Sequence, residues 1–127
     1  MPEKSLFEYA TIRIVPKVER EEFLNVGVIL YCRDQNFLKC LYALNKTKLE
    51  AVCGDTDCRE VEDHMISFDK ICRGDREGGP IAALDIASRF RWLTATRSTI
   101  VQTSRVHPGL CRDPDETLLD LHRKLVL

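Results

Sequence analysis

The sequence predicts an α+β protein: an antiparallel sheet of three to four strands, with helices packed mainly on one face. Strand-like segments come first in the chain, and helical periodicities are interleaved with strands later. No internal repeat is visible, and the chain has 127 residues, of which 44% are hydrophobic and 31% charged. This size and composition are typical of one folded domain, so we expect residues 1–127 to form a single domain.

The first two strands are expected at residues 7–15 and 23–33, joined by a charged hairpin loop. Pro16 stops the first strand, because proline cannot donate to the ladder. Alternate residues of the second strand form one unbroken apolar face, made of Leu24, Val26, Val28, Leu30 and Cys32. The other face of this strand carries Asn25 and Gly27.

A polar notch is predicted on that second face. If Arg13 pairs with Asn25 across the hairpin, Thr11 falls opposite Gly27. Glycine leaves a gap above a sheet, since it has no side chain to pack. We therefore expect a notch over Gly27, bordered by Arg13 and Asn25.

The next three elements follow from local signals. Residues 37–43 read as a third strand, and Asn45 can cap a short helix over 46–52. A capping box of Asp57 and Glu60 begins a longer amphipathic helix. That helix is expected to end at Gly74.

The C-terminal half contains two more helices and one more strand. Pro80 is suited to the first turn of a helix that continues through Phe90. The β-branched segment 98–104 reads as a fourth strand, in the same sheet as residues 23–33. The last helix is marked by the capping residue Asp113, with Pro114 at its first position and an apolar stripe of leucines after it.

The segment 89–112 is the unusual part of the charge pattern. It contains five arginines and no acidic residue, in a chain whose net charge is −1. Arginine offers a planar set of donors for phosphate or carboxylate, and His107 is expected in a turn fixed by Pro108 and Gly109. The candidate binding residues of this segment are Arg91, Trp92, Arg97, Ser98, Arg105 and His107. The alternative is that Arg89 and Arg91 are solvated or pair with the acidic helix 57–73, while Trp92 is part of the core.

Other classes of site are not indicated. The six cysteines include no CxxC pair, and with no signal peptide visible at the N-terminus we expect free thiols and a cytoplasmic protein. Cys53, Cys58, His64 and Cys72 lack the short paired spacings of structural zinc. The sequence contains no known catalytic or nucleotide-binding motif and no membrane-spanning segment, so no metal, cofactor, catalytic residue or membrane is expected.

Two long blocks of the sequence resemble a known family. "YATIRIVPKVEREEFLNVGVILYCRDQNFL" and "FRWLTATRSTIVQTSRVHPGL" are similar to the bacterial domain-of-unknown-function family 3037, over nearly the whole chain. Thr96 departs from the pattern, which has proline before the arginine. The resemblance implies no known activity. It implies a protein partner, since such proteins are often encoded beside HipA-like serine/threonine kinases.

The leading hypothesis is a non-catalytic binding module, a regulator or antitoxin-like partner of a HipA-like kinase. The family-marking residues include Arg13, Asn25, Arg97 and His107, and we expect these four to meet in space. The alternative is an enzyme or binder that acts on a phosphate-containing ligand through residues 89–112, with His107 as its acid or base. Nucleic-acid binding by the same segment is not favoured, but it is left open.

Overall fold

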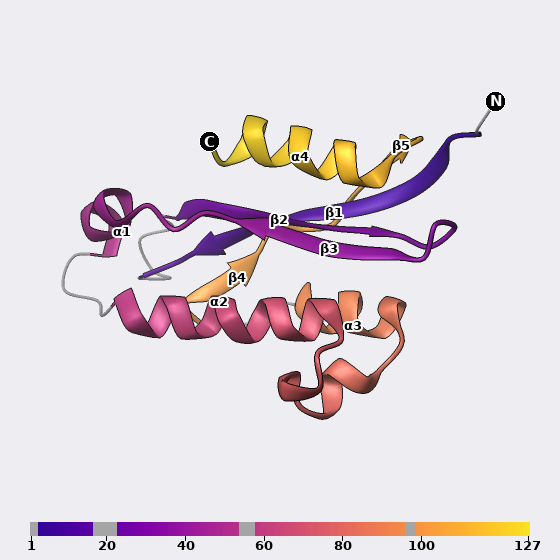
Figure 1. Cartoon of the computed structure of the whole chain (residues 1–127). Helices are drawn as coiled ribbons and strands as arrows, with labels where there is room; N and C mark the ends of the chain where they lie inside the picture. The colour runs from indigo at the N-terminus through magenta and orange to yellow at the C-terminus, as the bar shows by residue number, and fades with distance from the viewer. Residues whose placement is uncertain (1–2, 17–22, 54–57, 96–98) are drawn as a thin grey trace.

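A computed structural model of the chain describes residues 3–16, 23–53, 58–95 and 99–127 (Figure 1). It confirms the α+β class and the antiparallel sheet. The strands and helices, with the 3-10 turns η2 and η3, follow in this order: β1 (Ser5–Ile14), β2 (Leu24–Cys32), β3 (Phe37–Tyr42), α1 (Lys46–Cys53), α2 (Cys58–Arg73), η2 (Arg76–Gly78), η3 (Pro80–Ala83), α3 (Ile86–Leu93), β4 (Val101–Thr103), β5 (His107–Cys111) and α4 (Pro114–Leu125).

The sheet has five strands in the order β3-β2-β1-β4, and β5 also pairs with β1. β4 lies along the C-terminal part of β1 and β5 along its N-terminal part, so together they form one edge of the sheet. The predicted turn at His107 is wrong, because residues 107–111 form β5. An edge strand tolerates Pro108, since its missing N–H costs no bond on the open side.

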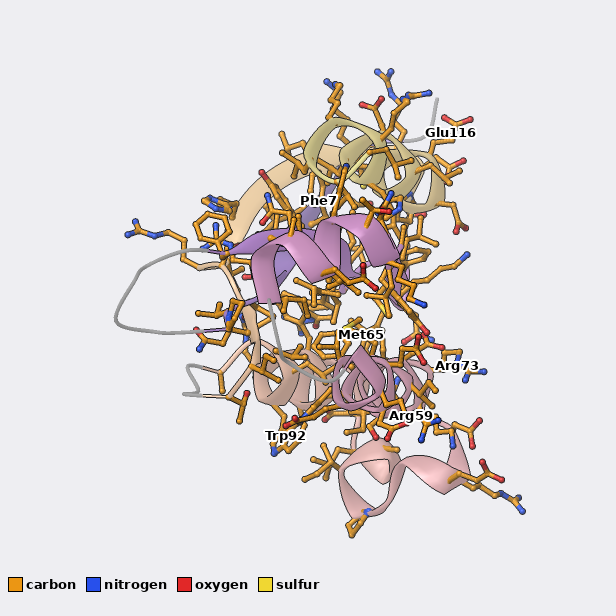
Figure 2. The ribbon with its side chains drawn as sticks, turned by 90° about the vertical axis from the view of Figure 1, so that its left-hand side faces the viewer. Phe7, Arg59, Met65, Arg73, Trp92 and Glu116 are labelled. Carbon is orange, nitrogen blue, oxygen red and sulfur yellow. The ribbon has the colours of Figure 1, made fainter. Side chains whose placement is uncertain are left out.

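Helices cover both faces of the sheet, most of them on one face. Figure 1 shows α2 and α3 on one side and α4 alone on the other. The larger core lies between the sheet and α2 and α3, and Met65 and Phe90 are fully buried there. The smaller core joins Phe7, Leu30 and Leu118 under α4. Figure 2 shows Met65 and Phe7 in these two layers.

A bulge in β2 overturns the predicted apolar face of this strand. Ile12 pairs with Gly27, but the next residue, Arg13, pairs with Asn25, so Val26 is an extra residue in the ladder. Because a bulge reverses the alternation of side chains beyond it, Val26 packs in the larger core while Val28 packs under α4. The prediction of one unbroken apolar face from Leu24 to Cys32 was therefore wrong.

Several predicted helix ends are confirmed. The Lys48 amide donates to Asn45 Oδ1 at 3.0 Å, and Gly74 follows α2 with φ of 70°. Asp113 accepts from the amide of Asp115 at the start of α4. The predicted helix from Pro80 through Phe90 is two elements, because Asp85 caps α3 and separates it from η3. Asp57, the predicted cap of α2, lies outside the described residues.

Candidate functional site

The predicted notch over Gly27 is filled. The pairing of Arg13 with Asn25 is confirmed, whereas Thr11 pairs with Val28 and not with Gly27, because of the bulge. A Cβ atom on Gly27 would lie 2.5 Å from the carbonyl oxygen of Leu41 and 3.2 Å from Ile12 Cδ1. Gly27 is thus a position of close packing, with no space above it for a ligand.

Arg13 and Asn25 make contacts within the fold. The Arg13 guanidinium lies over the Phe23 ring, with Cζ 4.1 Å from the centroid. Asn25 Nδ2 donates to the carbonyl oxygen of Leu125 at 3.4 Å, near the end of α4. Arg13 Nε and Asn25 Oδ1 are buried without a hydrogen-bond partner among the described residues. Arg13 thus holds the end of β1 against Phe23, and Asn25 holds the start of β2 against the end of α4.

His107 lies at a different level of the sheet from Arg13. It pairs with Tyr9 of β1, and the two rings stack with centroids 5.3 Å apart. Tyr9 precedes Arg13 by four positions, which corresponds to about 13 Å along a strand. Arg13 and Asn25 are neighbours, but the structure does not bring His107 to them. Arg97, the fourth member of the expected group, lies outside the described residues, as does Ser98.

The described arginines of segment 89–112 do not converge. Arg89 Nη1 donates to the carbonyl oxygens of Ala82 and Leu84, which holds η3 against α3. Arg91 forms an ion pair with Glu8 of β1 at 3.0 Å. Arg105 is exposed between β4 and β5, and Arg112 follows the far end of β5. A single anion site made from these side chains is not supported.

Of the described candidate residues, Asn25 lines a hollow of about 270 Å³ near the end of α4, and Trp92 lines a second cavity. The Trp92 side chain is 40% exposed, so the reading of Trp92 as a core residue is wrong, whereas its neighbour Phe90 is fully buried. The cavity beside Trp92 has a volume of about 320 Å³ and lies between α2, the end of α3 and the start of β4. Its lining residues are His64, Ser67, Phe68, Ile71, Trp92, Leu93, Ala95, Thr99, Val101, Gln102 and Thr103. We call this space the β4 cavity. Figure 2 shows Trp92 in the helical layer, on the opposite side of the sheet from α4.

The β4 cavity is lined mostly by apolar side chains, and His64 is the one ionisable residue in its described lining. Phe68, Leu93 and Val101 are buried and form apolar walls, and none of the described lining residues is an acid, a lysine or an arginine. Pockets of this type bind apolar groups and use a few polar atoms to orient them. The sequence pattern did not reveal the cavity, because its walls come from three elements that are distant in the chain.

A second, more open cleft adjoins the β4 cavity on α2. It is lined by Arg59, Glu60, Asp63, His64 and Ser67, and the last two residues also line the cavity. Glu60 lies 4.0 Å from His64. The cleft therefore places two carboxylates and one guanidinium beside an apolar hollow.

The described cysteines are buried and free, as predicted for them: Cys32, Cys40, Cys72 and Cys111. The Cys40 thiol lies 3.4 Å from Asp69 Oδ1. A hydrogen bond with Cys72, together with burial, raises the pKa of Cys40, and burial raises the pKa of Cys111. Thiols of this kind are poor nucleophiles, because only the thiolate attacks.

Comparison with known proteins gives the family and no further relative. Neither the curated proteins nor the solved structures include a significant match to the chain. None of the helices that the structure describes combines the length and the hydropathy needed to span a bilayer. The family described as "Protein of unknown function (DUF3037)" matches residues 9–126, nearly the whole sequence. The chain therefore belongs to this family of proteins of unknown function.

Proposed function

We propose that this chain is a non-catalytic module that binds another protein at the β4 cavity. The observation that carries the proposal is the partly exposed Trp92 on the wall of an apolar hollow of about 320 Å³. Tryptophan is among the residues that contribute most to protein interfaces, especially when it borders a pocket. A partner side chain that fills the cavity removes apolar surface of both proteins from water.

The described lining of this cavity favours an apolar group over a phosphate-containing ligand. A phosphate site needs several donors or cations directed at one point, and the described lining residues of the cavity carry no arginine or lysine. Arg91 is engaged with Glu8, and Arg89 with carbonyl oxygens of its own chain. A protein segment with an apolar side chain fits this lining better than a nucleotide or a nucleic acid.

We propose a HipA-like serine/threonine kinase as the partner, as the family resemblance implies. In this role the chain would act as a regulator or antitoxin-like subunit, and its effect would come from binding alone. The buried thiols and the stacked His107 support a non-catalytic role, because neither is placed as an activated nucleophile or base.

The test is co-purification of the chain with the kinase encoded beside it, followed by titration of wild type and Trp92→Ala. Truncating a tryptophan that dominates an interface costs 2 kcal/mol or more, so we expect the affinity to fall by about 30-fold. Leu119→Ala is the matched control, because Leu119 is 60% exposed on α4 and lies across the sheet from the cavity. Equal affinity of wild type and Trp92→Ala, or no complex with the kinase, would overturn the proposal.

A further inference from the structure

The outer side of β4 is an open sheet edge directly beside the β4 cavity. β4 pairs with β1 on one side, and no described strand pairs with its other side. Val101 and Thr103 of this strand also line the cavity. Unpaired backbone groups at an edge are a template for another strand.

The hydrogen bonds to β1 show which backbone groups are free to face outward. The Val15 amide donates to the carbonyl oxygen of Ile100 at 2.7 Å, and the Ser104 amide donates to that of Thr11 at 2.9 Å. Ile100 and Ser104 thus direct backbone groups toward β1. Successive residues of a strand direct their N–H and C=O groups to opposite sides, so the amides of Val101 and Thr103 point away from β1. Among the described residues, the outward carbonyl of Val101 accepts a hydrogen bond from the Thr99 hydroxyl alone, at 2.7 Å, and a carbonyl oxygen can accept a second bond.

We propose that an extended segment of the partner protein adds to β4 as a further strand and inserts one apolar side chain into the β4 cavity. This inference rests on the proposed function and specifies how the partner is recognised. Side chains of a strand alternate between the two faces of a sheet. A residue of the added strand that faces α2 therefore meets the cavity wall formed by Phe68 and Trp92.

The adjoining cleft sets a second feature of the partner segment. Its lining includes Glu60, Asp63 and Arg59, so acidic side chains outnumber the arginine there. A positively charged side chain complements this surface. Residues two positions apart in a strand share a face. The segment that fits best thus has a large apolar residue and, two positions away, a lysine or arginine.

The rest of this sheet edge is less suited to an added strand. β5 continues the edge beyond β4 and contains Pro108, which has no N–H to donate. Strand addition is therefore restricted to the short strand β4, where few main-chain bonds can form. Most of the specificity must come from the side chain in the cavity.

Synthetic eight-residue peptides test this recognition directly. The probes have a valine- and threonine-rich background, with leucine at the centre and lysine two residues before or after it. Binding is measured by fluorescence polarisation of labelled peptides. We expect alanine in place of leucine to weaken binding by about tenfold or more, and glutamate in place of lysine to weaken it by about threefold in low salt. If none of these peptides binds at millimolar concentration, the proposal is wrong.

Two variants at Thr103 separate strand addition from binding at the cavity alone. Thr103→Pro removes the outward N–H, whereas the control Thr103→Val keeps it and removes only the hydroxyl, which contacts Thr94. We expect Thr103→Pro to weaken peptide binding by about tenfold relative to Thr103→Val, because only the proline variant lacks the outward N–H. In the wild-type chain, the amides of Val101 and Thr103 should become protected from hydrogen exchange when peptide binds, whether or not the proline variant folds.

The outcomes distinguish this inference from the proposed function. If Trp92→Ala abolishes kinase binding while the amides of Val101 and Thr103 stay unprotected, the cavity binds the partner without strand addition. If Trp92→Ala has no effect on kinase binding, the proposed function fails, whatever the peptides do. A dimer of this chain that Thr103→Pro dissociates, in the absence of peptide binding, would assign the edge to a second copy and overturn the inference.

Discussion

Substituting Gly27 should cost folding stability, because the bulge places this residue against backbone atoms. A Cβ at this position would lie 2.5 Å from the Leu41 carbonyl oxygen and 2.8 Å from Tyr42 Cβ. The carbonyl belongs to β3, so relief requires the two strands to move apart. Overpacking of this kind costs about 1–3 kcal/mol, and the contact with main chain places Gly27→Ala in the upper half of that range. With an unfolding entropy of about 2.1 cal/mol/K per residue, a loss of 2–3 kcal/mol lowers the Tm by about 8–11 °C.

Urea unfolding followed by circular dichroism measures this effect in Gly27→Ala and Gly27→Val. We expect the order of stability to be wild type, alanine variant, valine variant, because each added carbon increases the overlap. Lys39→Ala on the neighbouring strand β3 is the control, since its ion pair with Asp115 is solvent-exposed and should contribute about 1 kcal/mol at most. If Gly27→Ala is as stable as wild type, the packing argument is refuted and the predicted notch regains support.

Three other properties follow from the structure. If residues 1–127 form one domain, as the sequence predicts, far-UV circular dichroism and Trp92 fluorescence should report one unfolding transition with the same midpoint. The thiols of Cys40 and Cys111, whose pKa values are raised, should resist iodoacetamide until the chain unfolds, as peptide mass spectrometry can show. Burial lowers the pKa of His122 below its ordinary value of 6.5. Its contribution to stability should be complete above about pH 6.5 and lost as the pH falls through the lowered pKa, with a weaker pH dependence in His122→Asn under urea denaturation.

Local signals in the sequence were sufficient for most of the elements. The start of α4 followed from Asp113 and Pro114, since the cap and the fixed φ of proline act within one turn. The bulge at Val26 could not be predicted in this way, because apolar residues on both sides of it satisfy either register. The position of His107 was also missed, since proline indicates a turn locally and an edge strand only when the sheet is known.

The candidate site was less predictable than the fold. The arginines of segment 89–112 share a sequence region, but α3 directs Arg91 to Glu8 while Arg105 lies at the sheet edge. These arginines are therefore close in sequence but do not gather in one place in the structure. Trp92 was among the predicted binding residues, but its partners in the cavity, such as His64, come from α2 and carry no local signal that relates them to it.

Fluorine NMR of Trp92 tests most directly whether a protein partner binds at the β4 cavity. Trp92 is the only tryptophan of the chain, so 5-fluorotryptophan gives one resonance, which is assigned without mutation. When unlabelled kinase is added in excess, we predict that this resonance moves to a new chemical shift in wild type and in the Leu119→Ala control. A kinase complex that forms while the resonance only broadens and keeps its chemical shift would contradict the proposed binding site.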